Sequence, residues 1–108
     1  MARVTDFVTV ARAGEIQPGS LLLVDLGGRR IAIVNADGAF YAVDGRCTHQ
    51  NVTMIDAPIV GCSIICSFHG SRFNLKTGVV EDSPAEIPLR TYSVIIDNDT
   101  IKLAYPET

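Results

Sequence analysis

The chain has no tryptophan, only two histidines and only three cysteines among its 108 residues. An odd number of cysteines argues against a secreted scaffold stapled by disulfides. An excess of positive charge is also missing, because 12 acidic residues face 9 basic ones and the formal net charge is −3. Nucleic acid is therefore not an expected partner, since binding phosphates needs a positive surface.

Long apolar runs are missing as well. The longest uncharged apolar-rich stretch, residues 57–68, is shorter than the roughly 20 residues that a membrane-spanning helix needs. Arg3 and Asp6 interrupt the first apolar residues, so the sequence shows no signal-peptide core. We expect a cytoplasmic protein without a membrane segment.

No segment shows a sustained helical period, and a single turn around residues 52–55 is the most helix we expect. Short β-branched and aromatic runs alternate instead with turn signals such as Gly27-Gly28, Asp37-Gly38 and Asp97-Asn98-Asp99. This pattern predicts an all-β fold, a small antiparallel β-sandwich or barrel that forms one domain over residues 1–108. The predicted strands are 6–11, 21–25, 30–35, 39–43, 91–96 and 100–104.

Both histidines lie close to cysteines in two similar segments. Cys47-Thr48-His49-Gln50 is followed by Cys66-Ser67-Phe68-His69-Gly70-Ser71, which gives the pattern C-x-H-x16-C-x2-H. Residues 63–65 lead into the second segment, and residues 72–74 leave it before a Lys76-Thr77-Gly78 turn. We expect each segment to be a loop at the end of a hairpin, where binding residues usually lie.

Three interpretations fit four such side chains. Unrelated buried cysteines and ordinary histidines are the simplest, although the pairing makes chance a poor explanation. Zinc accepts two cysteines and two histidines, but zinc sites usually pair cysteine with cysteine and histidine with histidine. One thiolate and one imidazole in each loop favour a two-iron centre, with Cys47 and Cys66 on one iron and His49 and His69 on the other. That ligand set is typical of a Rieske [2Fe–2S] cluster.

The downstream residues add a specific resemblance. The stretch resembles the Rieske ferredoxin family, whose signature is C-T-H, a spacer and then C-x-x-H-G. Further residues match the family's F-x-x-x-T-G turn and its proline-containing third loop: Phe73, Thr77-Gly78, Ser83-Pro84-Ala85 and Pro88-Leu89. The resemblance implies a Rieske-type fold, in which a cluster-binding part of about residues 45–85 places two hairpin loops on a basal sheet, and the third loop covers the cluster.

The resemblance also indicates which branch of the family is closer. The high-potential branch carries an extra disulfide, whose cysteines would fall at Val52 and Phe68 here. That branch also has a Tyr at the position of Phe73, whereas Ser71 is kept. Fewer hydrogen bonds to cluster sulfur lower the potential, so we expect a low-potential protein, toward roughly −150 mV. The Ser71 hydroxyl would raise that value if it faces a sulfide.

Several neighbouring residues have two interpretations each. Gly70 either allows a close backbone approach to the cluster or is a simple turn glycine, and Pro84 either shields the cluster or shapes its loop. Cys62 lies four residues before Cys66, on the same face if both are on one strand. It is expected to be a buried free thiol rather than a replacement ligand. Arg46 and Gln50 are candidate partner contacts.

The expected role is that of an electron carrier, not of an enzyme. An oxygenase needs a further mononuclear iron with its own histidines, and no dinucleotide fingerprint is present. Relatives with this resemblance pass electrons from a flavin-dependent reductase to the terminal oxygenase of bacterial systems for aromatic hydrocarbon catabolism. The two imidazoles at the loop tips are the implied electron port. The alternatives are a small subunit of an assimilatory nitrite reductase-like enzyme and a zinc-stabilised interaction module.

Overall fold

The computed structural model of the chain describes residues 7–48, 53–66 and 70–104. Within these ranges the elements are strands and one short 3-10 helix, and no helix there is long and apolar enough to span a bilayer. In chain order they are β1 (Phe7–Arg12), η1 (Ala13–Glu15), β2 (Leu21–Leu26), β3 (Arg29–Ala36), β4 (Ala39–Asp44), β5 (Ile59–Val60), β6 (Ser63–Ile65), β7 (Arg72–Asn74), β8 (Val80–Asp82), β9 (Thr91–Tyr92), β10 (Val94–Asp97) and β11 (Thr100–Ala104).

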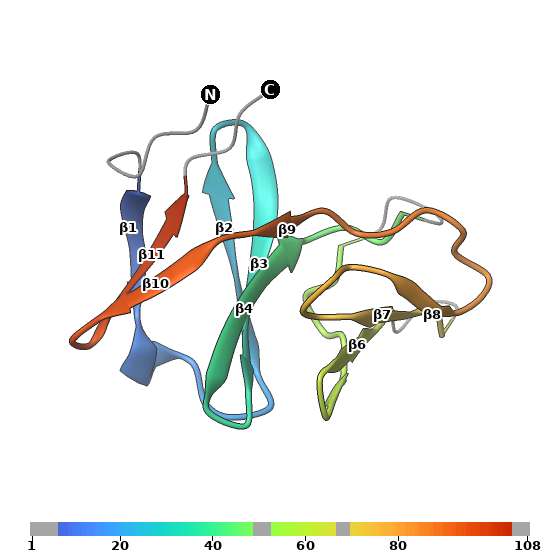
Figure 1. The fold of residues 1–108 in the computed structure, drawn as a ribbon, viewed down its shortest axis with the longest axis horizontal. Helices are drawn as coiled ribbons and strands as arrows, with labels where there is room; N and C mark the ends of the chain where they lie inside the picture. The colour runs from blue at the N-terminus through green and yellow to red at the C-terminus, as the bar shows by residue number, and fades with distance from the viewer. Residues whose placement is uncertain (1–6, 49–52, 67–69, 105–108) are drawn as a thin grey trace.

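The strands form three antiparallel sheets, with the orders β1-β11-β10, β2-β3-β4-β9 and β5-β6-β7-β8. Figure 1 shows the β5–β8 sheet and its loops as a lobe beside the other two sheets. The predicted all-β architecture, with hairpin loops on a basal sheet, is confirmed. The single-domain boundary of 1–108 stays a prediction.

Strand β3 is the centre of the core because both of its faces are covered. Ile31 and Ile33 pack into one buried cluster with Ile101 and Leu103 of β11. The alternate residues Ala32 and Val34 pack into a second cluster with residues of the β5–β8 lobe. Side chains alternate across a strand, so a continuous apolar run is what a strand between two layers needs.

The predicted hairpins are confirmed, and their turns have the expected backbone. Asp37 and Gly38 have φ values of 55° and 95°, and the turn joins β3 to β4 with Ala36 opposite Ala39. Two consecutive positive φ values are the mark of the hairpin turn that Asp-Gly favours. Gly27 and Gly28 join β2 to β3 in the same way, with φ values of 60° and 77°.

Other details differ from the sequence-based expectation. The predicted strand 91–96 is divided at Ser93, because Thr91–Tyr92 pairs with β4 in one sheet and Val94–Asp97 pairs with β11 in another. The short strands β5 and β8 and the helix η1 were not predicted. Near the single turn expected around 52–55, the described residues form a turn over 54–57, in which the Ala57 amide donates to the Met54 carbonyl at 3.0 Å. Residue 52 lies outside the described residues.

Glu81 on β8 ties the strands of the lobe together. Its carboxylate accepts the Ser63 hydroxyl from β6 at 2.6 Å and the Asn74 amide from β7 at 3.3 Å. The Ser63 bond and then the Asn74 bond stabilise the charged form and lower the Glu81 pKa. A charged side chain therefore reaches across β7 to join strands that have few residues each.

Gly78, in the turn between β7 and β8, contacts the segment that leads from the lobe to β9. Its amide donates to the Asn74 carbonyl at 2.7 Å, and its carbonyl accepts the Leu89 amide at 2.8 Å. Its φ is 77°, and a Cβ at this position would overlap the Leu89 carbonyl oxygen. Only glycine satisfies both conditions.

We expect Gly78→Ala to destabilise the protein far more than Gly28→Ala. Gly28 has the same φ of 77°, but a Cβ there would meet no atom within 4 Å. Both changes add the cost of a left-handed residue, about 1–3 kcal/mol, while the overlap at Gly78 adds roughly 1–3 kcal/mol more. Urea denaturation of the two variants, followed by circular dichroism, measures the difference. Equal losses would show that contact with Leu89 is unimportant.

Candidate metal centre

The first loop follows β4 at Gly45, where a side chain would meet close neighbours. A Cβ on Gly45 would lie 2.8 Å from the Arg30 Cγ and 3.0 Å from the Leu23 Cδ2. The Gly45 amide donates to the Arg30 carbonyl at 2.9 Å, and the Gly45 carbonyl accepts the Met54 amide at 2.8 Å. Arg46 forms a β-bridge with Thr53. The loop is thus closed at its base directly beside Cys47.

The second loop, residues 66–71, joins β6 to β7. The Cys66 amide donates to the Ser71 carbonyl and the Gly70 amide donates to the Cys66 carbonyl, both at 2.8 Å. Gly70 has a φ of 81°, so it has the turn geometry that glycine favours. Its predicted close approach to the cluster stays a prediction.

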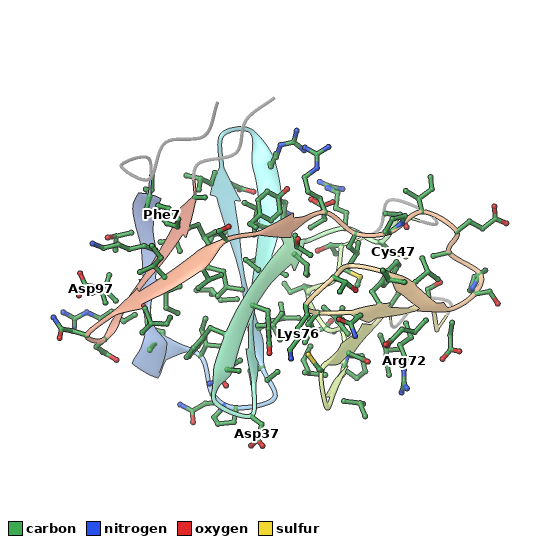
Figure 2. The ribbon with its side chains drawn as sticks, viewed as in Figure 1. Phe7, Asp37, Cys47, Arg72, Lys76 and Asp97 are labelled. Carbon is green, nitrogen blue, oxygen red and sulfur yellow. The ribbon has the colours of Figure 1, made fainter. Side chains whose placement is uncertain are left out.

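Cys47 and Cys66 are both 2% exposed, and they belong to the same buried cluster, together with Met54, Ile64 and Phe73. Figure 2 shows Cys47 beside the β5–β8 lobe. Two sequence-distant thiols that are buried together suit a soft metal centre, since a buried thiolate needs a compensating cation. The chemistry of this donor pair therefore fits the iron that two cysteines hold in a Rieske centre.

The predicted histidine ligands, His49 and His69, lie outside the described residues, as do Gln50, Val52 and Phe68. Within 7–48, 53–66 and 70–104, no three His, Cys, Asp or Glu side chains gather into a metal site. The four-ligand set stays a prediction.

A third loop, residues 83–89, is attached to both of the others. The Ala85 amide donates to the Ser71 hydroxyl at 3.0 Å, and the Thr48 hydroxyl donates to the Ile87 carbonyl at 2.6 Å. Each of the two loops therefore supplies one hydroxyl that holds the third loop in place: Thr48 in the first loop and Ser71 in the second. Pro84 lines a small hollow here with Thr48, Glu86 and Ile87. Its shielding of the cluster stays a prediction.

Ser71 and Phe73 have clear structural roles of their own. Ser71 is fully buried, and its oxygen accepts the Ala85 amide, while its hydroxyl proton can donate to a second partner. Phe73 is fully buried in the cluster that holds Cys47 and Cys66, and its ring has no hydroxyl to donate. The predicted effects of both residues on the reduction potential are consistent with these positions and stay predictions.

Asp44, at the end of β4, anchors the approach to the first loop. Its carboxylate accepts the Tyr92 hydroxyl at 2.6 Å and the Arg90 amide at 2.9 Å. The Asp44 amide donates in turn to the Arg90 carbonyl at 2.9 Å. Burial, and then the bond to Asp44, raise the pKa of Tyr92 to about 12. No local sequence signal links residues 44 and 92, which is why sequence reasoning missed this anchor.

Cys62 is not part of the buried cysteine pair. It is a half-buried free thiol in the turn between β5 and β6, and neither Cys62 nor Cys66 belongs to a strand, so the condition for a shared strand face is not met. It forms no disulfide. A hydrogen bond with the Cys62 sulfur is the main cause that raises the pKa of Tyr41. The thiol therefore has a partner on β4, which favours a packing role.

These features define a small β protein that presents two buried cysteines on adjoining hairpin loops. The sequence model of the Rieske [2Fe-2S] domain family matches residues 6–93. The chain belongs to this family, and its cofactor is one Rieske-type [2Fe–2S] cluster. The zinc-stabilised module is thereby set aside.

Within the Rieske family, the similar proteins are ferredoxins. The chain is 30% identical over 99 residues to Ferredoxin CarAc of Metapseudomonas resinovorans, covering 91% of this chain and 92% of that protein. It is 32% identical over 98 residues to the ferredoxin component of the naphthalene 1,2-dioxygenase/salicylate 5-hydroxylase systems of a Ralstonia species, covering 91% and 94%. A solved complex of reduced oxygenase and oxidized ferredoxin in carbazole 1,9a-dioxygenase contains a chain that matches with a TM-score of 0.87 and 29% identity, over 95% of this chain and 96% of that one.

The hydroxyl tether of the third loop makes a testable prediction. Thr48→Val removes the bond to the Ile87 carbonyl at nearly constant volume and costs about 1 kcal/mol of local stability. We expect the Ala85 amide, whose own partner is Ser71, to exchange with deuterium about fivefold faster. Thr48→Ser keeps the hydroxyl and should restore slow exchange. Fast exchange in both variants, or in neither, would contradict the tether.

The Tyr92 anchor predicts a pH dependence. Because the folded-state pKa is raised from 10.0 to about 12, folding favours the neutral phenol. This contribution to stability is fully present below pH 10 and is lost as the pH rises toward 12. The ultraviolet titration of the wild type minus that of Tyr92→Phe should have a midpoint near 12. A midpoint close to that of free tyrosine would show that the bond to Asp44 does not hold in solution.

Proposed function

We propose that this chain is the ferredoxin component of an aromatic-ring dioxygenase system and that it delivers single electrons to the terminal oxygenase. The observation that carries the proposal is the full-length similarity to ferredoxin components, at 30–32% identity, together with the two buried cysteines on adjoining loops. The chain covers more than nine tenths of both relatives, so the similarity is not confined to a shared domain of a larger enzyme.

In this proposal Cys47 and Cys66 bind one iron, and His49 and His69 bind the other. The bound cluster supplies the one-electron chemistry. The described residues act around it: the buried position of both cysteines excludes water, and the hydrogen bonds at the base of each loop hold each cysteine segment in place. Histidine ligands place neutral nitrogen donors where cysteine would place thiolates, which raises the reduction potential above that of plant-type ferredoxins.

The chain is proposed to carry electrons without catalysing a reaction itself. Its two histidines are both assigned to the cluster, so no histidine is left for the facial triad of a mononuclear iron oxygenase. The solved complex of an oxygenase with a similar ferredoxin supports a terminal oxygenase as the acceptor. A flavin-dependent reductase is proposed as the donor, with His49 and His69 as the electron port and a cytoplasmic location for all components.

The ligand assignment predicts which cysteines matter. Cys47→Ser, Cys66→Ser, His49→Ala and His69→Ala should each lose most of the bound iron, the acid-labile sulfide and the visible absorption. Cys62→Ser is the matched control, and it should retain all three because Cys62 lies outside the buried pair. Iron and sulfide analysis of each purified variant checks this. A full cluster in His49→Ala, or its loss in Cys62→Ser, would contradict the assignment.

The carrier function has its own test. The reduced holoprotein is mixed anaerobically with a panel of terminal oxygenases, from the carbazole, naphthalene, biphenyl and p-cumate dioxygenase systems, and oxidation of the ferredoxin is followed by its spectrum. We expect at least one of these oxygenases to be reduced and to hydroxylate its aromatic substrate when a reductase regenerates the ferredoxin. A chain that keeps its cluster but reduces none of them would contradict the proposed function.

A further inference from the structure

A hollow of ≈ 480 Å³ lies beside the first loop. Arginine side chains from two segments line it: Arg29 and Arg30 come from the start of β3, and Arg46 comes from the first loop. Cys47 and Ile87 also form part of its wall. The hollow therefore joins one predicted iron ligand to a concentration of positive charge.

This concentration of charge runs against the composition of the chain, whose net charge is −3. Asp44 is the acidic residue in the lining, and its oxygens already accept the Tyr92 hydroxyl and the Arg90 amide. Arg30 pairs with Asp25 at 3.2 Å, but both side chains are well exposed, so that ion pair is weak. Arg29 and Arg30, beside a carboxylate that is already engaged, therefore leave a surface that favours an anion.

Arg29 gives the second, independent indication. Its Nε is shielded from solvent and is the one buried side-chain nitrogen or oxygen atom without a hydrogen-bond partner in the described part of the chain. A buried N–H without an acceptor is costly, and native proteins rarely keep one without a reason. Arg29 also lines the hollow, where a carboxylate could bind the planar guanidinium through two parallel hydrogen bonds and bring an acceptor to it.

Ile87 gives the hollow an apolar rim. Its side chain is 63% exposed, while its carbonyl oxygen is held by the Thr48 hydroxyl at 2.6 Å. The tether therefore fixes an exposed apolar side chain next to the arginines. Arginines around an apolar contact are typical of protein interfaces, whereas a small anion would make no use of the isoleucine.

We propose that this hollow receives an acidic segment of the terminal oxygenase, with an Asp or Glu carboxylate on Arg29 and an apolar side chain against Ile87. This inference rests on the proposed function and deepens it, because it identifies the surface and the chemistry of the oxygenase contact. An oxygenase seated here lies against Cys47 and therefore close to the predicted cluster. The arginines steer the encounter through charge complementarity.

Charge reversal at Arg29 tests the proposal on the holoprotein. The partner is the oxygenase of the panel that the wild type reduces fastest, and the readouts are the Kd by titration calorimetry and the rate of electron transfer. We expect Arg29→Glu to raise the Kd at least tenfold at low ionic strength, and Arg29→Gln to raise it by a smaller factor. Added salt should weaken wild-type binding and narrow the difference between wild type and Arg29→Glu, since it screens the attraction.

Lys102→Glu on β11 is the matched control, because it makes the same charge change in the sheet away from the loops (Figure 1). It should alter the Kd less than twofold. The visible spectrum and the reduction potential of each variant report whether the cluster is intact, and circular dichroism reports folding. Arg29→Lys, which keeps the charge and removes the planar fork, should bind more tightly than Arg29→Gln.

Three outcomes separate the claims. Equal Kd values for Arg29→Glu and Lys102→Glu would overturn the docking site while leaving the carrier function intact. Slower reduction by the ferredoxin reductase of the same system, with unchanged oxygenase binding, would assign the hollow to the reductase and also overturn the proposal. A wild type with a full cluster that reduces no oxygenase in the panel would contradict the proposed function and, with it, the inference.

Discussion

The burial of two cysteines from two different loops in one core cluster is the constraint on which the rest of the structure depends. Cys47 follows the basal sheet and Cys66 follows β6, and both belong to one buried cluster, each on a loop that hydrogen bonds close at its base. A rigid frame of this kind is what electron transfer requires, since a ligand set that does not move adds little reorganisation when the charge changes.

Hydrogen bonds also hold the third loop, at the surface of the site. Thr48 and Ser71 use their hydroxyls to hold the backbone of residues 85 and 87, so one loop is tied to both cysteine segments. The exposed side chain of Ile87 is consequently presented at a fixed position, next to the arginine-lined hollow. The hydrogen bonds that tie the loops together thus also fix the position of Ile87 at the surface.

Much of this was predictable from local patterns, and the remainder depends on contacts between distant residues. Asp37-Gly38 and Gly27-Gly28 predicted their hairpins because positive φ at a turn is a local requirement. The two-residue strand β5 and the three-residue strand β8 were missed, since they are too short to show a period and depend on pairing within the lobe. The division at Ser93 and the Asp44–Tyr92 bond follow from tertiary packing, as does the position of Cys62 in a turn beside Tyr41. The cysteine pair was found because its spacing from histidine is itself the chemical signal, whereas the histidines lie outside the described residues.

The central claim is that two histidines and two cysteines of this chain hold one two-iron cluster, and pulsed electron paramagnetic resonance of the reduced holoprotein with ¹⁵N-labelled histidine tests it most directly. We predict coupling of the reduced cluster to the ring nitrogens of two histidines, lost in part when either His49 or His69 is replaced. A paramagnetic cluster without histidine nitrogen coupling, or a colourless protein that contains zinc instead of iron, would contradict the assignment.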